Sequence, residues 1–248
     1  METFLEPALI FRVQPYGESD MIVSFVTPGR GRQRGLAKGA RRSRRRFVNC
    51  LDIFCLVRLE YGLKKAGGLC FLHSGRLLEG FPGLRSSFRE LSYASFMVEL
   101  TEELFPVGVA EPGIFDLFCG VLERLSAKDR VEAALLVFEG KAMALGGFAV
   151  NLGSCFVCGR AYRYEGRAVF DPGEGAIACT ACRQETALTP GLSPEGVSLL
   201  KRIQEEPWNS IKDLDPDEAA SAELRTVNRL HRETRVGGII RSAKYLSG

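Results

Sequence analysis

Four cysteines in two short-spaced pairs offer the clearest chemistry in this 248-residue sequence. Two residues separate the members of each pair and twenty separate the pairs, and the four are Cys155, Cys158, Cys179 and Cys182. This spacing is typical of a zinc ribbon, in which four thiolates fill the shell of one structural Zn2+ ion per chain and leave no position for a catalytic water. Two disulfides or free thiols are the alternatives. A cytosolic chain disfavours the first, and the paired spacing disfavours the second.

A second candidate site is the stretch of residues 29–47, which holds nine basic residues and no acid. The nine are Arg30, Arg32, Arg34, Lys38, Arg41, Arg42, Arg44, Arg45 and Arg46. The first three occupy every second position, so in a strand they project from one face, and the later ones predict a mobile loop. Because the planar guanidinium suits phosphate oxygens, we predict a surface that binds the phosphate backbone of a nucleic acid. The alternative is a solvated, partly disordered arm.

Catalytic machinery is not expected. The only histidines, His73 and His231, have no metal-ligand spacing between them. A loop at residues 62–69 has the glycine spacing of a phosphate-binding loop but lacks its lysine and hydroxyl residue, so we predict a hairpin loop there. The acidic residues do not cluster around the basic strand as a metal-dependent nuclease requires. The sequence therefore predicts a binding protein and no enzyme.

The elements that must position the basic residues are short strands. Apolar residues alternate with polar ones between residues 8 and 79, and turn residues interrupt the alternation. Five strands are expected, at residues 8–13, 21–26, 30–37, 51–61 and 69–78. Five short strands with a basic face predict an OB-like barrel, a fold that binds oligonucleotides. Another kind of small barrel is the alternative.

Beyond residue 80 the apolar spacing becomes helical. Helices are expected at residues 85–105, from Pro112, at 130–145 with Asp129 as N-cap, from Pro194 with Ser193 as N-cap, and from Pro216 with Asp215 as N-cap. A hairpin turning at Glu165-Gly166 is expected between the cysteine pairs. The chain is thus predicted as an α+β protein, with a five-stranded OB-fold barrel in residues 1–80. An α-helical domain follows in residues 81–248, with an inserted four-cysteine zinc ribbon at about 153–185.

Charge is divided unequally along the chain. Residues 1–80 carry 14 Lys and Arg against 7 Asp and Glu, whereas the remaining 168 carry 19 against 23. The N-terminal part is therefore expected to hold nucleic acid, and the acidic remainder is freer to receive proteins. No apolar run approaches the roughly 20 residues that cross a bilayer, and the opening residues lack the pattern of a signal peptide. We expect a cytoplasmic protein.

Five segments occur in an order that a known family shares. They are residues 16–20 (YGESD), residues 35–42 (GLAKGARR), the helix end from Phe138-Glu139 to Gly146-Gly147, the four cysteines, and Arg241-Ser242. Along essentially its whole length the chain resembles the RecO family of bacterial DNA-repair mediators. The resemblance implies an OB fold, a helical domain with a zinc ribbon, and no enzymatic turnover. It also implies binding to single- and double-stranded DNA and annealing of complementary strands.

The resemblance further implies protein partners. With RecR, family members help RecA replace single-stranded DNA-binding protein (SSB) in the RecF pathway, and they hold the acidic tail of SSB. Where the family often has a basic residue for that tail, this chain has Leu136 and Val137, so a nearby cation is needed, with Lys141 the first candidate, then Arg241 and Arg130. The alternative for Lys141 is a merely solvated side chain. The alternative function is a zinc-ribbon scaffold or regulator whose basic arm binds nucleic acid non-specifically.

Overall fold

The computed structural model describes residues 2–63 and 68–246, and the chain forms two compact units. The first unit comprises Met1–Val98 and Phe105–Ala127, and the second comprises Glu99–Leu104 and Lys128–Gly248. Helix α1 (Phe88–Leu104) contributes to both units. Among the described residues, no helix is long and apolar enough to span a membrane.

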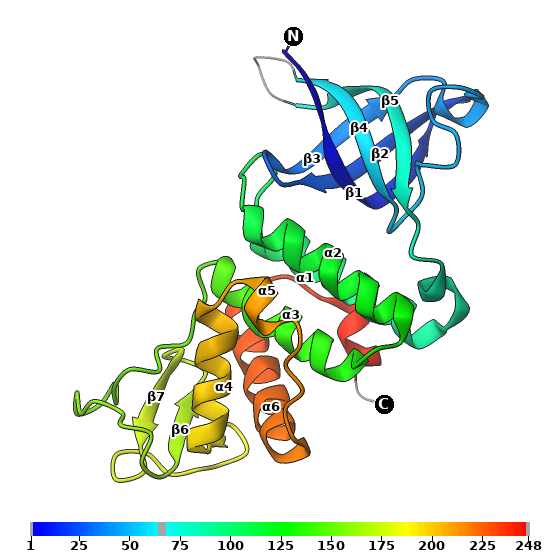
Figure 1. The fold of residues 1–248 in the computed structure, drawn as a ribbon. Coiled ribbons are helices and arrows are strands. Elements are labelled where there is room, and N and C mark those ends of the chain that lie inside the picture. The colour runs from blue at the N-terminus through cyan, green and yellow to red at the C-terminus, as the bar shows by residue number, and fades with distance from the viewer. Residues whose placement is uncertain (1, 64–67, 247–248) are drawn as a thin grey trace. The chain divides into compact units, whose positions relative to one another are not determined.

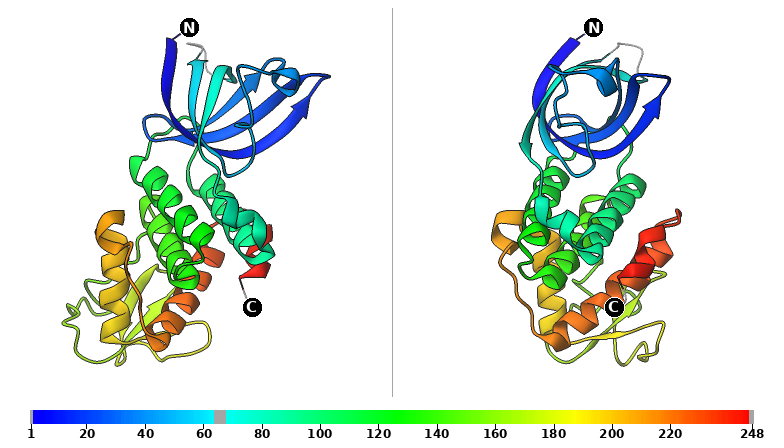
Figure 2. Two further views of the ribbon diagram at one scale, coloured as in Figure 1. Left: turned by 45° about the vertical axis from the view of Figure 1, so that its right-hand side comes forward. Right: turned by 90° about the vertical axis from the view of Figure 1, so that its right-hand side faces the viewer.

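A closed five-stranded barrel makes up most of the first unit (Figure 1). Its strands pair in the order β1-β2-β3-β5-β4, and the right-hand view of Figure 2 shows the ring that they close. The strands are β1 (Glu2–Tyr16), β2 (Asp20–Thr27), β3 (Gly31–Ala37), β4 (Leu56–Leu63) and β5 (Cys70–Glu79). Helices and a cysteine cluster follow in the chain, so the predicted α+β class, with an OB-like barrel first, is confirmed.

Side chains of alternate residues fill the barrel, as the period of two along each strand requires. Phe25, Leu59 and Tyr61 are among the fully buried residues of this core. The hydroxyl of Tyr61 donates to Glu6 Oε1 at 2.5 Å, so the one polar atom of that ring is paired. Phe47, which ends the basic stretch, is also buried in the same cluster.

Two predicted strands have different bounds in the structure. β1 is longer than the predicted residues 8–13, because its first half pairs with β4 and its second half with β2, with a bulge between Ile10 and Arg12. β4 begins at Leu56 instead of residue 51, because residues 51–54 form bends and turns in which Phe54 has a positive φ of 60°. The loop predicted at residues 62–69 lies partly outside the described residues.

Helices complete the first unit. A short 3-10 helix (Pro82–Ser86) leads into α1, and α2 (Pro112–Ala127) follows. Pro112 is the first residue of α2, as predicted. The ring of Phe118 on α2 lies 4.9 Å from the ring of Phe11 on β1, centroid to centroid, so α2 packs against the barrel.

The second unit combines helices with a small three-stranded sheet of order β7-β6-β8. Its elements are α3 (Val131–Leu145), β6 (Ala168–Asp171), β7 (Ala176–Cys179), β8 (Gly191–Leu192), α4 (Pro194–Glu205), α5 (Trp208–Ile211), α6 (Glu218–Arg235) and a 3-10 helix (Arg241–Tyr245). Apolar residues of α3, α4, α6 and the sheet share one core.

The start of α3 and the hairpin of the ribbon differ from the predictions. The N-cap of α3 is Arg130, in a left-handed conformation with φ of 44°, and no side chain caps this end, so the predicted cap by Asp129 is wrong. The guanidinium of Arg130 instead donates to the carbonyl of Asp213 at 3.0 Å. The hairpin turns between β6 and β7, through the Asp-Pro-Gly-Glu-Gly sequence of residues 171–175, and not at Glu165-Gly166.

Side chains cap the starts of α4 and α6, the first as predicted and the second two residues later than predicted. Ser193 Oγ accepts from the N–H of Gly196 at 3.0 Å at the start of α4, as its place before Pro194 predicted. At the start of α6, Asp217 Oδ1 accepts from the N–H of Ala220 at 2.8 Å, so the predicted cap by Asp215, with Pro216 as the first helical residue, is wrong. Each cap satisfies an amide at a helix end that has no partner within the helix.

Candidate nucleic-acid interface and metal centre

The structure brings the four predicted cysteine ligands together. The Sγ atoms of Cys155, Cys158, Cys179 and Cys182 all lie within 4.8 Å of one another. Those of Cys158 and Cys179 are 4.0 Å apart. A Zn–S bond of about 2.3 Å places tetrahedral ligands about 3.8 Å apart, so the cluster has the size of a four-thiolate metal site. Among the described residues, this is the one group of three or more His, Cys, Asp or Glu side chains placed to hold a metal ion.

Tight turns surround Cys155 and Cys179, and backbone N–H groups favour the thiolate form of Cys155 that a metal requires. The N–H of Gly159 donates to the carbonyl of Cys155, and that of Cys182 donates to the carbonyl of Cys179, each at 2.9 Å. Burial opposes ionisation of Cys155, but hydrogen bonds from backbone N–H groups outweigh it and lower the pKa of this thiol to about 6. The hydrogen bonds of Cys182 with Cys179 and Cys158 raise its own pKa to about 12. A divalent cation would stabilise all four as thiolates.

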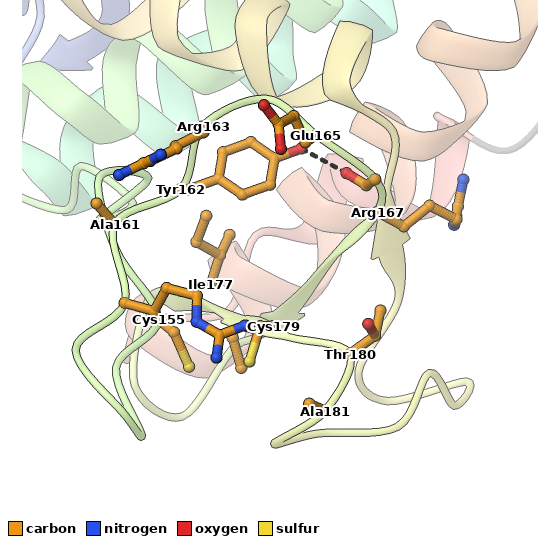
Figure 3. A pocket seen from close by; sticks show the side chains of 13 residues that line it. Cys155, Ala161, Tyr162, Arg163, Glu165, Arg167, Ile177, Cys179, Thr180 and Ala181 are labelled. Atoms are coloured by element: carbon orange, nitrogen blue, oxygen red, sulfur yellow. Dashed lines mark hydrogen bonds between the residues drawn. The ribbon is translucent and has the colours of Figure 1, made fainter.

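A cavity of about 540 Å3 opens beside the cysteine cluster, and Figure 3 shows Cys155 and Cys179 together on its wall. The ring of Tyr162 lies across the cavity from them, and its hydroxyl donates to the carbonyl of Gly166 at 2.8 Å (Figure 3). Ile177 of β7 also lines the wall. The loop that joins the first cysteine pair to β6 is therefore closed on itself by the hydrogen bond between Tyr162 and Gly166, and it shares the cavity wall with Ile177 of the sheet.

Ion pairs fix the ribbon to the helices of the second unit. Arg167, just before β6, donates to Glu185 at 2.8 Å and to Glu223 of α6 at 2.9 Å. Glu223 also accepts from the hydroxyl of Ser193, the N-cap of α4, at 2.8 Å. At the other end of β6, Asp171 pairs with Arg183, one residue after Cys182. The cysteine cluster therefore sits on a frame joined to α4 and α6.

The second candidate site is the basic arm, which we define as residues 38–46. The sequence predicted a mobile loop, but three backbone contacts tie this arm to the barrel. Gly39 N–H donates to Asp20 Oδ1 at 2.8 Å, Arg41 N–H donates to the carbonyl of Ser19 at 3.0 Å, and the carbonyl of Arg46 accepts from Gly75 N–H at 2.8 Å. The second residue of the arm, Gly39, is left-handed with φ of 65°, and buried Phe47 follows the arm directly.

The three arginines at alternate positions before the arm differ in their surroundings. Arg34 on β3 is exposed. The guanidinium of Arg30 lies 3.5 Å from the centroid of the Phe4 ring, and that of Arg32 donates to the carbonyl of Phe105 at 2.6 Å. Two of the three predicted DNA-binding arginines are therefore engaged within the first unit, and Arg34 is the one whose charge is fully presented to solvent.

Several cations of this region have no carboxylate partner. Within the described part of the chain, no ion pair or side-chain hydrogen bond involves Arg34, Arg42, Arg44 or Arg45, and all four are exposed. The guanidinium of Arg41 donates to the carbonyl of Glu18, and that of Arg46 donates to the carbonyl of Lys38. Unpaired guanidinium groups gathered on one arm and the neighbouring strand make a surface that attracts an anion.

Phe71 is a residue of this surface that the sequence analysis missed. It lies on β5, where it pairs with Leu36 of β3, and the ammonium of Lys38 is 5.9 Å from the centroid of its ring. Aromatic rings beside cations are a common stacking platform for bases, and Phe71 offers such a ring beside Lys38. The sequence could have indicated this position, because Phe71 alternates with the buried residues Cys70 and Leu72 and therefore lies on the outer face of the strand.

The residues predicted to bind a protein tail are not gathered at a surface. Leu136 and Val137 are buried in the core of the second unit. Lys141 is buried as well, and its ammonium donates to the carbonyls of Gln204 at 2.8 Å and Glu206 at 2.7 Å, so the alternative of a solvated side chain is wrong. Arg241 is exposed at the start of the last 3-10 helix.

The histidines are placed as structural residues. His231 is buried on α6, where its Nε2 is 2.7 Å from the carbonyl oxygen of Phe148 and its ring packs against Phe170. Burial lowers the pKa of this imidazole below its usual value, which favours the neutral ring. His73 lies on β5 of the other unit. The two histidines therefore belong to different units.

Comparison with known proteins covers nearly the whole chain. Residues 1–81 match the family model described as "Recombination protein O N terminal", and residues 85–244 match "Recombination protein O C terminal". Proteins named DNA repair protein RecO are similar over most of their length. The one from Desulforudis audaxviator is 30% identical over 95% of both chains. Those from Anaeromyxobacter sp. (strain Fw109-5) and Geobacter metallireducens are 36% and 31% identical, over 80% and 82% of this chain and 78% and 80% of their own.

Proposed function

Because this chain belongs to the RecO family of DNA repair proteins, we propose that it is a recombination mediator that binds single- and double-stranded DNA and anneals complementary strands. The observation that carries the proposal is the set of exposed arginines on β3 and the basic arm that have no carboxylate partner among the described residues. The backbone of DNA supplies the anions that these side chains lack.

Annealing follows from charge neutralisation. Two DNA strands repel each other through their phosphates, and arginines that neutralise phosphates on both strands lower this repulsion so that complementary bases can meet. Arg34, Arg42, Arg44 and Arg45 contact the phosphates, and the ring of Phe71 stacks against a base. Neither contact reads the sequence of the DNA, so the protein acts on any complementary pair. The reaction consumes no nucleotide, and the protein performs no enzymatic turnover.

The cysteine cluster supports this function structurally. When Zn2+ is bound by Cys155, Cys158, Cys179 and Cys182, it supplies four metal–sulfur bonds that hold the two turns of the ribbon together. All four ligand positions then belong to the protein. One zinc ion per chain therefore stabilises the second unit, and the nucleic-acid surface lies on the first.

The partners that we propose follow from family membership. In the RecF pathway the protein acts with RecR to help RecA replace SSB on single-stranded DNA. The acidic character of residues 81–248 leaves that part of the chain free to receive proteins instead of DNA. Since Lys141 is buried and already bonded to two carbonyls, the acidic tail of SSB would need an exposed cation such as Arg241.

Binding of fluorescent oligonucleotides across a range of salt concentrations tests the proposal. If six phosphates are engaged, log affinity for single strands should fall with log salt at a slope of roughly −4, with little dependence on sequence. Replacing Arg34, Arg42, Arg44 and Arg45 by Ser should reduce the slope by about 3, at roughly 0.7 for each phosphate. A matched control replaces Lys201, Arg202, Lys212 and Arg229, four exposed cations of the second unit, by Ser. A flat line for the wild type would refute the proposal.

A further inference from the structure

Two exposed arginines face each other on neighbouring strands of the barrel. Arg58 of β4 and Arg76 of β5 are directly opposite in the antiparallel register, and both are exposed. Side chains at such positions have Cβ atoms about 4.5–5.5 Å apart, and like charges there are destabilising. The pair therefore costs the barrel stability unless another molecule supplies a negative charge.

No carboxylate within the described residues neutralises this pair. Neither guanidinium takes part in an ion pair or hydrogen bond there. The acid that follows Arg58 on the same face of β4 is Glu60, and its carboxylate accepts from the hydroxyl of Ser74 at 2.7 Å. On its other side Arg58 is opposite Pro7 of β1, which carries no charge. Arg58 and Arg76 thus present two unbalanced positive charges.

The pair is continuous with the basic arm. β3 pairs with β5 only through Cys70 and Phe71 among the described residues, so no strand covers the side of β5 beside Arg76. The arm takes that place, because the carbonyl of Arg46 accepts from the N–H of Gly75 at 2.8 Å. Arg76 is the next residue along β5. A path of cations therefore runs from β3 through the arm to Arg76 and then to Arg58.

We propose that Arg58 and Arg76 form a second phosphate-binding site, at which the DNA backbone that crosses the basic arm continues over β5 and β4. Two guanidinium forks side by side can share one phosphate or hold two successive ones, and either arrangement removes their repulsion. This inference rests on the proposed function and extends its DNA path around the barrel. It adds two contacts that are distinct from those of the arm.

Salt titration of single-strand binding by the Arg58→Ser/Arg76→Ser variant tests the site. The slope of log affinity against log salt should become less steep by about 0.7 if the two arginines share a phosphate, and by about 1.4 if each holds its own. The Arg58→Lys/Arg76→Lys variant keeps the charges and should keep the slope. Arg202→Ser/Arg229→Ser, which removes two exposed arginines of the second unit, is the matched control and should behave as wild type.

Thermal unfolding without DNA separates a binding role from a folding role. Removing a repulsive pair should leave the melting temperature of the Arg58→Ser/Arg76→Ser protein unchanged or raise it. A fall in melting temperature would show that the arginines stabilise the barrel and would overturn the inference. Capture of a poly-glutamate peptide that is lost in this variant, with an unchanged DNA slope, would assign the pair to an acidic protein instead and would also overturn it.

Different results would refute the proposed function and the second phosphate-binding site. A wild-type protein whose DNA affinity does not respond to salt refutes the proposed function itself. A wild-type protein with a steep slope, together with an Arg58→Ser/Arg76→Ser variant of the same slope, leaves the arm as the DNA site and refutes the second site alone. An equal loss of slope in the Arg202→Ser/Arg229→Ser control would assign the effect to net charge, and this result too would refute the second site.

Discussion

The buried ion pair between Glu139 and Arg232 makes a strong prediction about the second unit. Arg232 Nη1 of α6 donates to Glu139 Oε1 of α3, and each residue is only 6% exposed. Replacing Arg232 by Met keeps much of the volume but leaves the carboxylate buried beside an apolar group. Breaking a buried pair in this way costs about 3–5 kcal/mol. Since the free energy of unfolding of natural domains is about 5–15 kcal/mol, this unit should become marginally stable.

The double replacement Glu139→Leu/Arg232→Met should recover most of the lost stability. Exchanging both partners of a buried pair for apolar residues of similar size is often neutral, because no charge is left without a partner. The cost of Arg232→Met alone should also shrink as pH falls. Burial raises the pKa of the Glu139 carboxyl, so a folded protein that lacks the arginine takes up a proton more readily than its unfolded chain does.

Urea unfolding followed by tryptophan fluorescence measures this effect. The single tryptophan, Trp208, packs against the core of the second unit and therefore reports on that unit. A loss below about 1 kcal/mol in Arg232→Met would refute the reasoning, because a stranded buried charge costs more. Equal losses in the single and double variants would also refute it, since the defect would then come from packing.

Four further predictions follow from the same structure. Cys155→Ser protein should lose its zinc by elemental analysis and unfold its second unit at lower temperature while the barrel still binds DNA; a full zinc content would contradict the ligand set. Because burial lowers the pKa of His231, the second unit should lose stability as pH falls below the ordinary value of 6.5, and His231→Gln should lose less; parallel profiles would exclude this imidazole. Lys141→Ala should lower stability but leave affinity for an SSB tail peptide unchanged in fluorescence polarisation; weaker binding would place Lys141 in the tail site. Phe71→Ala should weaken single-strand binding by about 1–3 kcal/mol with the salt slope preserved, and a changed slope would mean that Phe71 positions phosphate contacts.

The barrel could be predicted from sequence because alternation reports the inner face of each strand. The strands at residues 21–26, 30–37 and 69–78 lie within about one residue of β2, β3 and β5. The ends of β1 and β4 could not be predicted in this way. They depend on which strands pair, and residues 2–7 of β1 pair with β4, about 55 residues away along the chain. A local pattern carries no information about such a partner.

The clustering of the four cysteines could be predicted because their spacing is a local property of two tight turns. The hairpin between them was misplaced at Glu165-Gly166, since a glycine there signals a turn but does not say whether strands flank it. Gly166 does have a positive φ of 73°, but it lies in the loop before β6. In the same way, Lys141 was expected at the surface, either as the cation for an acidic tail or as a solvated side chain. Its burial depends on two carbonyls at the end of α4, more than 60 residues later.

Predicting which basic residues remain available needed the structure. All nine cations of residues 29–47 are equivalent in the sequence, yet Arg30 and Arg32 are engaged with Phe4 and Phe105. Arg58 and Arg76 could not be predicted as a pair, because each is an isolated cation in its own strand. Only the antiparallel register of β4 and β5 shows that they are opposite each other. Contacts between distant segments therefore decide which charges can meet a phosphate.

The annealing rate of complementary fluorescent oligonucleotides tests the central claim most directly, measured without nucleotide or added metal. The account predicts that the wild-type protein accelerates annealing over the protein-free reaction, and that salt suppresses the acceleration. It further predicts that the variant with Arg34, Arg42, Arg44 and Arg45 replaced by Ser loses most of it, whereas the control with Lys201, Arg202, Lys212 and Arg229 replaced retains it. No acceleration by the wild type, or equal acceleration by the arm variant, would contradict the account.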